Sequence, residues 1–213
     1  MIKINEIFFS IQGESSLVGL PTVFVRTSGC HLRCSYCDTT YAYHEGQKMT
    51  TQDIFQKIQA FPTRQVCLTG GEPLLQKGIY DLLTLLIEND YKISIETSGD
   101  LDCHLLPKEV KKIIDIKTPD SGAPDAIEYK NLLFNEDPDT EFKFVICSEH
   151  DSEWAFNFVK QHDLAKKAQV FFSPSHGKIA ANWLAEEILK NNSKVRLQLQ
   201  LHKYIWSEHK RGV

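Results

Sequence analysis

The sequence lacks an apolar run long enough to cross a membrane. A membrane-spanning helix needs about 20 consecutive apolar residues, and no run in this chain approaches that length. The opening stretch, residues 1–6, also lacks the basic start and the unbroken apolar segment of a secretory signal. We therefore expect a cytoplasmic protein that makes no membrane contact.

Dense positive charge is absent as well. The formal net charge of the 213 residues is −4, and Lys and Arg form no concentrated cluster, whereas nucleic-acid binding needs one positive face to displace counterions from phosphates. Low-complexity tracts, linkers and close internal repeats are also missing. We expect no nucleic-acid partner, a small-molecule substrate, and a single domain over residues 1–213.

What the sequence does contain is an alternation of short β-rich runs with longer amphipathic runs. This alternation predicts a mostly parallel sheet, which right-handed crossovers curl in one direction. Eight βα units take about 250 residues, so we predict an α/β fold: a partial, open, parallel βα barrel of roughly six strands. The predicted strands are Thr22–Thr27, Gln65–Thr69, Lys92–Glu96, Ile113–Lys117, Glu141–Ile146, Val170–Ser173 and Val195–Leu199, and the predicted helices are Thr51–Ala60, Ile79–Asn89, Ser152–His162 and Asn182–Lys190.

Residues suited to chemistry follow several of these strands. Active residues of parallel α/β folds gather at the carboxyl ends of strands, so the sequence predicts one shared site. The residues in question are Cys30, Gly70, Gly71, Glu72, Thr97, Ser98, Gly99, Lys117 and Ser173.

Three of the six cysteines, Cys30, Cys34 and Cys37, lie within eight residues in the spacing C-x3-C-x2-C. This clustering suits a metal better than a set of disulfides. Three thiolates can each hold one iron of a 4Fe–4S cluster and leave the fourth iron open, whereas most cluster sites and structural zinc sites use four protein ligands. A zinc site would need a fourth ligand, and His31 is too close to Cys30 for normal co-ligation.

With Tyr36 before its last cysteine, the triplet resembles the radical S-adenosylmethionine (SAM) superfamily. The resemblance implies that the amino and carboxylate groups of SAM chelate the open iron. One electron from the cluster then cleaves SAM, and the resulting 5′-deoxyadenosyl radical abstracts a hydrogen atom from the substrate. Tyr36 would pack near the adenine of SAM, and Asp38 would lie in the same binding segment.

The segment Thr69-Gly70-Gly71-Glu72-Pro73 follows the next predicted strand. Two glycines allow a backbone to approach a ligand closely, and Glu72 offers an acceptor for an ammonium group, although a plain strand-to-helix turn also suits these residues. The segment resembles the superfamily's GGE motif, which binds the amino group of SAM. The resemblance implies further SAM contacts at residues that alone would be turn and capping residues, namely Lys117, Ser121, Ser173, Pro174 and Ser175.

Polar residues also flank the cysteine triplet. The amide of Gln12 and the carboxylate of Glu14, on either side of Gly13, suit the hydrogen-bonding edge of a guanine-like ring, and the planar guanidinium of Arg26 suits a substrate carboxylate. A polar hairpin with solvated charges is the alternative. After the triplet, the hydroxyl of Thr39 could bind Mg²⁺, or Thr39 could be an ordinary turn residue.

Together with the Q-x-H-K segment near the C-terminus, these motifs resemble the 7-carboxy-7-deazaguanine synthase family of queuosine and deazapurine biosynthesis, from about Ile7 to Lys203. The resemblance implies a lyase that converts 6-carboxy-5,6,7,8-tetrahydropterin to 7-carboxy-7-deazaguanine and ammonia by hydrogen abstraction at C6 and ring contraction, with SAM re-formed. Mg²⁺ on Thr39 would bind the substrate carboxylate. The implied substrate contacts are Gln12, Gly13, Glu14, Arg26 and Thr69, with His202 or Val213 near the C-terminus.

The resemblance also implies a division of the chain and its partners. Residues 1–28 would bind substrate, residues 29–40 would form the cluster loop, and residues 200–213 would close the pocket. The protein would be a homodimer that receives electrons from an external donor of the flavodoxin or ferredoxin type. The remaining cysteines are too far apart for a second cluster, and we interpret Cys67 and Cys147 as small buried apolar residues.

Two other functions compete with this interpretation. A radical SAM activase of a glycyl-radical enzyme shares the cysteine spacing and a small barrel, but it would need a large protein-docking surface and would not need both Q-G-E and C-D-T. A non-catalytic iron–sulfur sensor would have a fully ligated cluster that is indifferent to SAM. The histidines form no signature of a zinc hydrolase.

Overall fold

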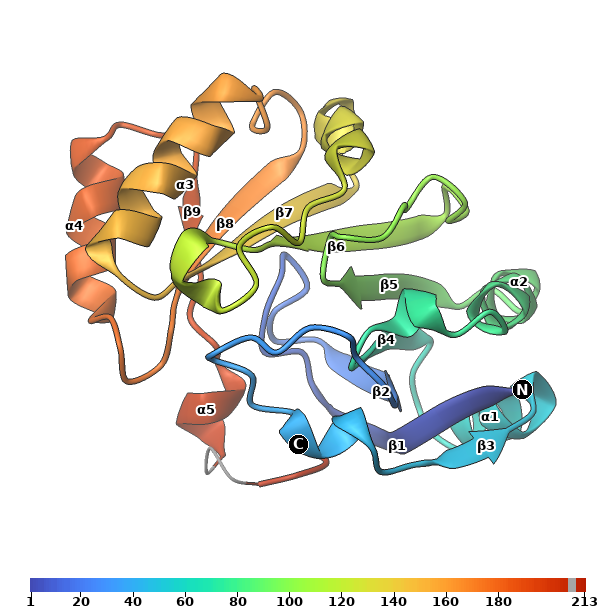
Figure 1. Cartoon of the computed structure of the whole chain (residues 1–213). Helices are drawn as coiled ribbons and strands as arrows, with labels where there is room; N and C mark the ends of the chain where they lie inside the picture. The colour runs from blue at the N-terminus through green and yellow to red at the C-terminus, as the bar shows by residue number, and fades with distance from the viewer. Residues whose placement is uncertain (207–209) are drawn as a thin grey trace.

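The computed structural model describes residues 1–206 and 210–213. Within them, nine strands form one sheet in the order β3-β1-β2-β4-β5-β6-β7-β8-β9, with β3 and β9 at its open edges (Figure 1). The sheet curves without closing, which confirms the predicted open, partial barrel, although it has nine strands where roughly six were predicted. The strands are β1 (Ile2–Ile11), β2 (Pro21–Thr27), β3 (Gln47–Met49), β4 (Gln65–Gly70), β5 (Lys92–Thr97), β6 (Val110–Ile116), β7 (Thr140–Ile146), β8 (Gln169–Pro174) and β9 (Arg196–Leu197).

All neighbouring strands from β2 to β9 pair in parallel, as predicted. The strand β1 instead pairs antiparallel with β2 and β3, and it was not among the predicted strands. A register shift between Ile4 and Glu6 marks a bulge in β1. Because a bulge reverses which residues face the core, it breaks the two-residue alternation by which a strand is recognised.

The four predicted helices are all present and lie outside the curve of the sheet (Figure 1). The third begins three residues before its predicted start at Ser152, because the Ser148 side chain caps it by accepting a hydrogen bond from the backbone N–H of Asp151. The helices are α1 (Thr51–Gln59), α2 (Ile79–Glu88), α3 (Glu149–Gln161), α4 (Ala181–Lys190) and the short α5 (His202–Ile205), with 3₁₀ turns η1 (Thr40–Tyr43), η2 (Pro73–Leu75), η3 (Pro119–Ser121) and η4 (Tyr129–Glu136).

The hydrophobic core fills the space between these helices and the outer face of the sheet. In β7, Phe142 and Phe144 are fully buried in it, and the Phe144 ring contacts Phe158 of α3 with 6.1 Å between ring centroids. Because successive side chains of a strand point to opposite faces, Lys143 and Val145 point to the inside of the curve. The core thereby fixes the backbone of side chains that face the site.

The loop between β1 and β2, residues 12–20, folds into the inside of the curve (Figure 1). Its Ser16 backbone N–H donates to the buried carboxylate of Glu141 in β7 at 3.1 Å. The Gln12 side chain reaches Glu96 of β5, with 3.3 Å between Nε2 and Oε1. This loop therefore crosses the inner face of the sheet and closes part of it.

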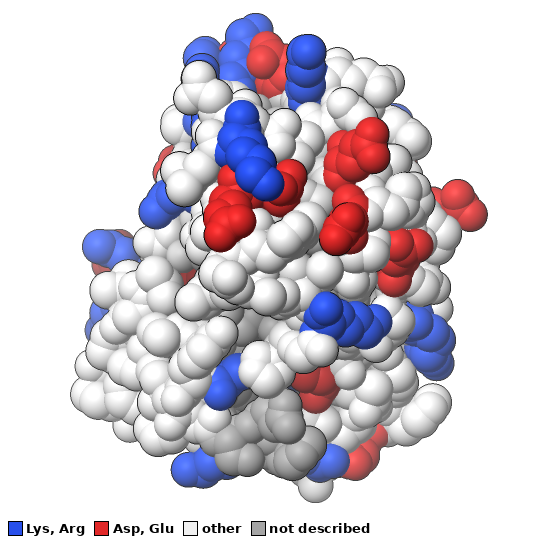
Figure 2. Space-filling view, turned by 90° about the vertical axis from the view of Figure 1, so that its left-hand side faces the viewer, with Lys and Arg blue, Asp and Glu red and all other residues white. Residues whose placement is uncertain are grey.

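Among the described residues, no helix is both long enough and apolar enough to cross a bilayer. The face of the molecule that carries α3 and α4 shows acidic and basic side chains intermingled over its upper half (Figure 2). On this face the positive charge is dispersed, as the sequence suggested.

Candidate active site

A cavity of about 210 Å³ lies inside the curve, beside the carboxyl ends of the parallel strands. It brings together residues from the N-terminal segment, the cluster loop and the strand ends, in agreement with the prediction of one shared site. The predicted site residues that line it are Glu14, Arg26, Cys30, Cys34, Tyr36, Cys37, Asp38, Thr39, Thr69, Gly70, Gly71, Thr97, Ser98 and Lys117.

The three cysteines of the triplet are free, partly exposed and on the wall of this cavity. The guanidinium of Arg33 holds their loop together by donating to the carbonyl oxygens of Cys30 and Leu32 at 2.8 and 2.7 Å. Burial raises the pKa of the Cys30 and Cys34 thiols above its usual value. Binding of a metal would therefore displace protons from these thiols.

The geometry of the loop does not suit a single zinc ion. The imidazole of His31 contacts the carboxylate of Asp100 and is not turned toward the cysteines as a fourth ligand. Tetrahedral zinc, with Zn–S bonds of about 2.3 Å, would hold thiolates about 3.8 Å apart. Among the described residues, the only three possible ligand side chains with donor atoms within 4.8 Å of one another lie elsewhere, so the triplet fits a wider, multi-iron cluster better.

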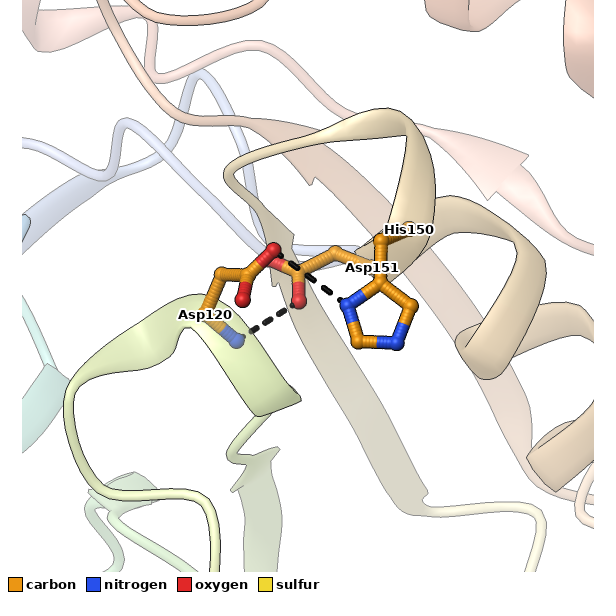
Figure 3. Close-up of side chains that lie close together, drawn as sticks. All are labelled: Asp120, His150 and Asp151. Carbon is orange, nitrogen blue, oxygen red and sulfur yellow. Dashed lines mark hydrogen bonds and ion pairs between the residues drawn. The ribbon is translucent and has the colours of Figure 1, made fainter.

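That other group is Asp120, His150 and Asp151, where η3 meets the start of α3 (Figure 3). The buried carboxylate of Asp151 accepts hydrogen bonds from the backbone N–H groups of Asp120 and Cys147 and from the Thr118 hydroxyl, each at 2.9 Å. His150 is exposed, with its Nδ1 3.4 Å from Asp120 Oδ2. Since protein donors already engage both Asp151 oxygens, we interpret this group as a structural tie.

The two glycines after β4 hold the cluster loop against the strand. The backbone N–H of Gly71 donates to Thr27 at 3.1 Å, and that of Glu72 donates to Gly29 at 2.8 Å. A Cβ atom on Gly71 would lie 2.1 Å from the Gly29 carbonyl oxygen, and Gly70 has a φ of +140°. Only glycine fits at these two positions.

Glu72, a predicted SAM contact, is occupied by protein donors. Its carboxylate is fully buried and is not on the cavity wall. It accepts from the backbone N–H and hydroxyl of Ser98 at 2.7 and 2.5 Å, from Thr97 Oγ1 at 2.9 Å and from the Leu74 N–H at 2.9 Å. Burial raises the pKa of Glu72, and the hydrogen bonds from Ser98 oppose this rise. These donors join the end of β4 to the end of β5 through Glu72, and its contact with the amino group of SAM stays a prediction.

Lys117 lies in the cavity between β6 and the cluster loop. Its Nζ is 2.9 Å from Asp115 Oδ2 and 3.4 Å from the Tyr36 hydroxyl. Burial alone would lower the pKa of Lys117, but the Asp115 carboxylate reverses the effect and raises it. The other oxygen, Asp115 Oδ1, is buried and has no hydrogen-bond partner among the described residues. The cavity thus holds a charged lysine and a buried acceptor available to a ligand.

The other predicted SAM contacts lie beside this cavity. Ser175 lines a neighbouring cavity of about 370 Å³, which also includes Tyr36. The backbone carbonyl of buried Ser121 accepts from the Ser35 N–H at 2.7 Å and so supports the cluster loop. The predicted contacts that do not line the main cavity are Glu72, Ser121, Ser173, Pro174 and Ser175.

Two predicted substrate residues, Gln12 and Gly13, do not line the cavity. Glu96 accepts from Gln12 Nε2 at 3.3 Å and from Thr69 Oγ1 at 2.9 Å, so one carboxylate positions both side chains. A Cβ atom on Gly13 would lie 2.6 Å from His202 Nδ1. Gly13 therefore lets the C-terminal segment approach the β1–β2 loop.

His202 and Val213 line an adjoining cavity of about 260 Å³. This cavity shares Arg26, Asp38 and Thr39 with the main one. Both C-terminal residues consequently lie next to predicted site residues. Residues 207–209 of the predicted closing segment lie outside the described residues.

Lys143 was missed by the sequence motifs, although it lines the cavity. Its signal is a lone charge between Phe142 and Phe144 in a predicted strand, which places it on the face opposite the two aromatic rings.

Cys67 is buried, as predicted. The prediction for Cys147 is wrong, because its thiol is partly exposed at the carboxyl end of β7. The cavity residues Glu96, Asp115 and Gln200 came from segments that the sequence did single out.

Comparison with known proteins agrees with this geometry. Residues 24–126 match the Radical SAM superfamily. A 7-carboxy-7-deazaguanine synthase from Chlorobaculum tepidum is 44% identical over 214 residues, covering 100% of this chain and 97% of the relative. One from Koribacter versatilis is 40% identical with complete coverage of both. The crystal structure of QueE from Escherichia coli has the same fold, with a TM-score of 0.79, 24% identity and 94% coverage of each chain. The chain therefore belongs to the 7-carboxy-7-deazaguanine synthase family of the radical SAM superfamily.

Proposed function

We propose that this protein converts 6-carboxy-5,6,7,8-tetrahydropterin to 7-carboxy-7-deazaguanine and ammonia, as a radical SAM lyase of queuosine and deazapurine biosynthesis. The observation that carries this proposal is the single cavity that joins the three cluster cysteines to Glu14 and Arg26. Its support from relatives is the shared family name over the whole chain. The cavity meets two needs of the reaction, a place for the radical source and a place for a carboxylated ring.

The cofactors of the superfamily, a 4Fe–4S cluster and SAM, fit the residues of the cavity. Cys30, Cys34 and Cys37 would hold the cluster, and the open oxygen of Asp115 is an acceptor for a hydroxyl or ammonium group of SAM. When bound, these cofactors supply the radical that abstracts hydrogen from the substrate. Lys117, held by Asp115, keeps a fixed positive charge beside the cluster loop.

The cavity offers complementary groups for both ends of the pterin. The Arg26 Nε donates to Glu6 Oε1 at 2.8 Å, which fixes the plane of the guanidinium and leaves its other N–H groups for the substrate carboxylate. Glu14 provides a carboxylate that accepts from ring N–H groups. Thr69, whose hydroxyl donates to Glu96, adds a further polar group to the same cavity.

Thr39 is our proposed protein ligand for Mg²⁺. It lines both cavities with Arg26, and its hydroxyl donates to Asp38 Oδ1 at 2.7 Å. A Mg²⁺ ion keeps several waters and shares substrate oxygens, so one protein hydroxyl near the expected substrate carboxylate is sufficient. The ion would orient that carboxylate together with Arg26.

The remaining parts of the proposal follow from the family resemblance. They are the homodimer, the external donor of the flavodoxin or ferredoxin type and the cytoplasmic location. The division into a substrate-binding segment (residues 1–28), a cluster loop (29–40) and a closing segment (200–213) within one domain belongs to the same proposal. The inward position of the β1–β2 loop supports the first segment's role.

Anaerobic turnover tests the proposed function. Reconstituted protein is incubated with the tetrahydropterin, SAM, Mg²⁺ and a reductant, and we expect carboxy-deazaguanine and ammonia with little net loss of SAM. SAM cleavage without this product would favour the activase of a glycyl-radical enzyme. A reduced cluster whose spectrum does not respond to SAM would favour the iron–sulfur sensor.

A further inference from the structure

Lys143 of β7 contacts Glu14 in the wall of the cavity. The Nζ of Lys143 contacts Oε2 of Glu14, and each side chain is only 14% exposed. The other oxygen, Glu14 Oε1, accepts from Gln200 Nε2 at 3.0 Å. The carboxylate is therefore held from the sheet on one side and from the C-terminal segment on the other.

The two partners differ in how firmly their backbones are fixed. Lys143 lies in a strand paired on both sides, opposite Asp115 of β6 and Phe171 of β8, and its neighbours Phe142 and Phe144 are in the core. Glu14 belongs to the β1–β2 loop, whose backbone follows no regular pattern. The backbone of Lys143 is thus the more firmly fixed of the two, and the lysine restricts where the Glu14 carboxylate can lie.

The charges around the pair keep it ionised. Burial alone would raise the pKa of Glu14, but Lys143 and then His202 hold it below its usual value. Burial would lower the pKa of Lys143, but Glu14, Asp115 and Glu96 all face it and raise it. At neutral pH both groups are charged, and Lys143 is the largest favourable influence on the Glu14 carboxylate.

We propose that Lys143 is a positioning residue that keeps Glu14 ionised and aimed at ring N–H donors of the substrate. This inference rests on the proposed function, in which Glu14 contacts the pterin. An ionised carboxylate only accepts hydrogen bonds, whereas a protonated one also donates. Lys143 would thereby select a ring edge that presents N–H groups, as an aminopyrimidinone does, and reject an edge that presents acceptors.

The test substitutes Lys143→Met and measures KM and kcat for the tetrahydropterin. Truncating one partner of a buried charge pair is costly, so we expect KM to rise by about 30-fold or more, with a smaller change in kcat, since ground-state binding is what is lost. Without the lysine, the pKa of Glu14 rises, and KM should increase as the pH falls from about 8 to about 6, whereas the unaltered protein stays flat. Lys143→Arg should restore most of the affinity and the flat profile.

A neighbouring ion pair, which joins Lys111 of β6 to Glu141 of β7, supplies the matched control. Lys111 Nζ lies 3.0 Å from Glu141 Oε1, and neither residue lines the cavity, so Lys111→Met should leave KM and its pH profile unchanged. Cluster absorbance and SAM cleavage without pterin show that each variant is folded; if Lys143→Met loses the cluster, Lys143→Gln takes its place.

Three outcomes would overturn the inference in distinguishable ways. An unchanged KM with a flat pH profile in the folded Lys143 variant would remove Lys143 from substrate positioning and leave the proposed function intact. An equal rise of KM in Lys111→Met would show a general loosening of the β1–β2 loop. Absence of product from the unaltered protein would overturn the proposed function itself, and this inference with it.

Discussion

Single residues set the chemistry of the cavity, and their predictability depends on how local their partners are. The cysteine spacing acts within eight residues of the chain, so its role could be predicted from the sequence. The paired glycines were recognised by residue type alone, because Thr27 and Gly29, which they approach, lie more than 40 residues earlier in the chain. The hydrogen bonds of Glu72 could not be predicted, because its carboxylate is occupied by Ser98, 26 residues further on. The role of Lys143 was not predicted for the same reason, since its partner Glu14 belongs to a loop that is distant in the sequence.

Cys34 gives the most direct prediction at this scale. Cys34→Ala leaves two thiolates, too few to hold a cubane whose fourth iron already lacks a protein ligand. We expect loss of the cluster absorbance and of product formation. Cys147→Ala is the control, because that thiol is also partly exposed but lies outside the triplet; an intact cluster spectrum in Cys34→Ala would contradict the assignment.

Thr39 separates magnesium binding from cluster chemistry. Thr39→Ala removes one hydroxyl, so we expect weaker stimulation of turnover by Mg²⁺ with SAM cleavage preserved. The exposed neighbour Thr40, at the start of η1, provides the matched variant Thr40→Ala. Titration of activity with Mg²⁺ checks both variants, and unchanged metal dependence in Thr39→Ala would remove Thr39 from the site.

Among the secondary-structure elements, strands with one clear alternation and helices with one apolar face were predictable. The buried strands β4 to β8 and the helices α1 to α4 follow such patterns. The strand β1 does not, since its bulge near Glu6 divides it into two alternations. The start of α3 depends on Ser148 as a cap, a local signal of the kind S-x-x-D that the apolar periodicity does not contain.

Asp151 gives the prediction at this scale, because it joins the first turn of α3 to η3. Asp151→Ala removes the acceptor for three hydrogen bonds, from Thr118, Asp120 and Cys147. Hydrogen bonds to a charged group contribute about 1.5–3 kcal/mol each, so we expect the free energy of unfolding to fall by about 3 kcal/mol or more.

Urea unfolding of the cluster-loaded protein measures this effect. The control is His150→Ala in the same group, whose side chain is 66% exposed and whose loss should change the free energy of unfolding by less than about 0.5 kcal/mol. Similar values for the two variants would show that Asp151 is not the structural tie.

For the whole molecule, the decisive contacts join the two ends of the chain. Lys203 Nζ donates to Gln200 Oε1 at 2.8 Å and lies 3.1 Å from Asp38 Oδ2, and Gln200 in turn donates to Glu14. One network thus connects the C-terminal segment to the cluster loop and to the β1–β2 loop. The sequence resemblance predicted a closing segment. Its contacts could not be deduced from the sequence, because they join residues more than 160 positions apart and leave no local pattern.

This network predicts how the closing segment is held. The Lys203 side chain is only 9% exposed, so Lys203→Met removes a largely buried charge and leaves Asp38 with His202 at 3.9 Å as its nearest cationic partner on α5. We expect amide hydrogen exchange in residues 201–206 to accelerate by about tenfold or more, because a loss of about 1.4 kcal/mol in local opening free energy has that effect. KM for the pterin should rise in parallel, since Gln200 loses the contact that orients it toward Glu14.

The control is Lys190→Met, which breaks an exposed helical pair with Glu187 and should change neither the exchange rate nor KM. Unaltered exchange in Lys203→Met would show that the segment is held by its backbone contacts alone.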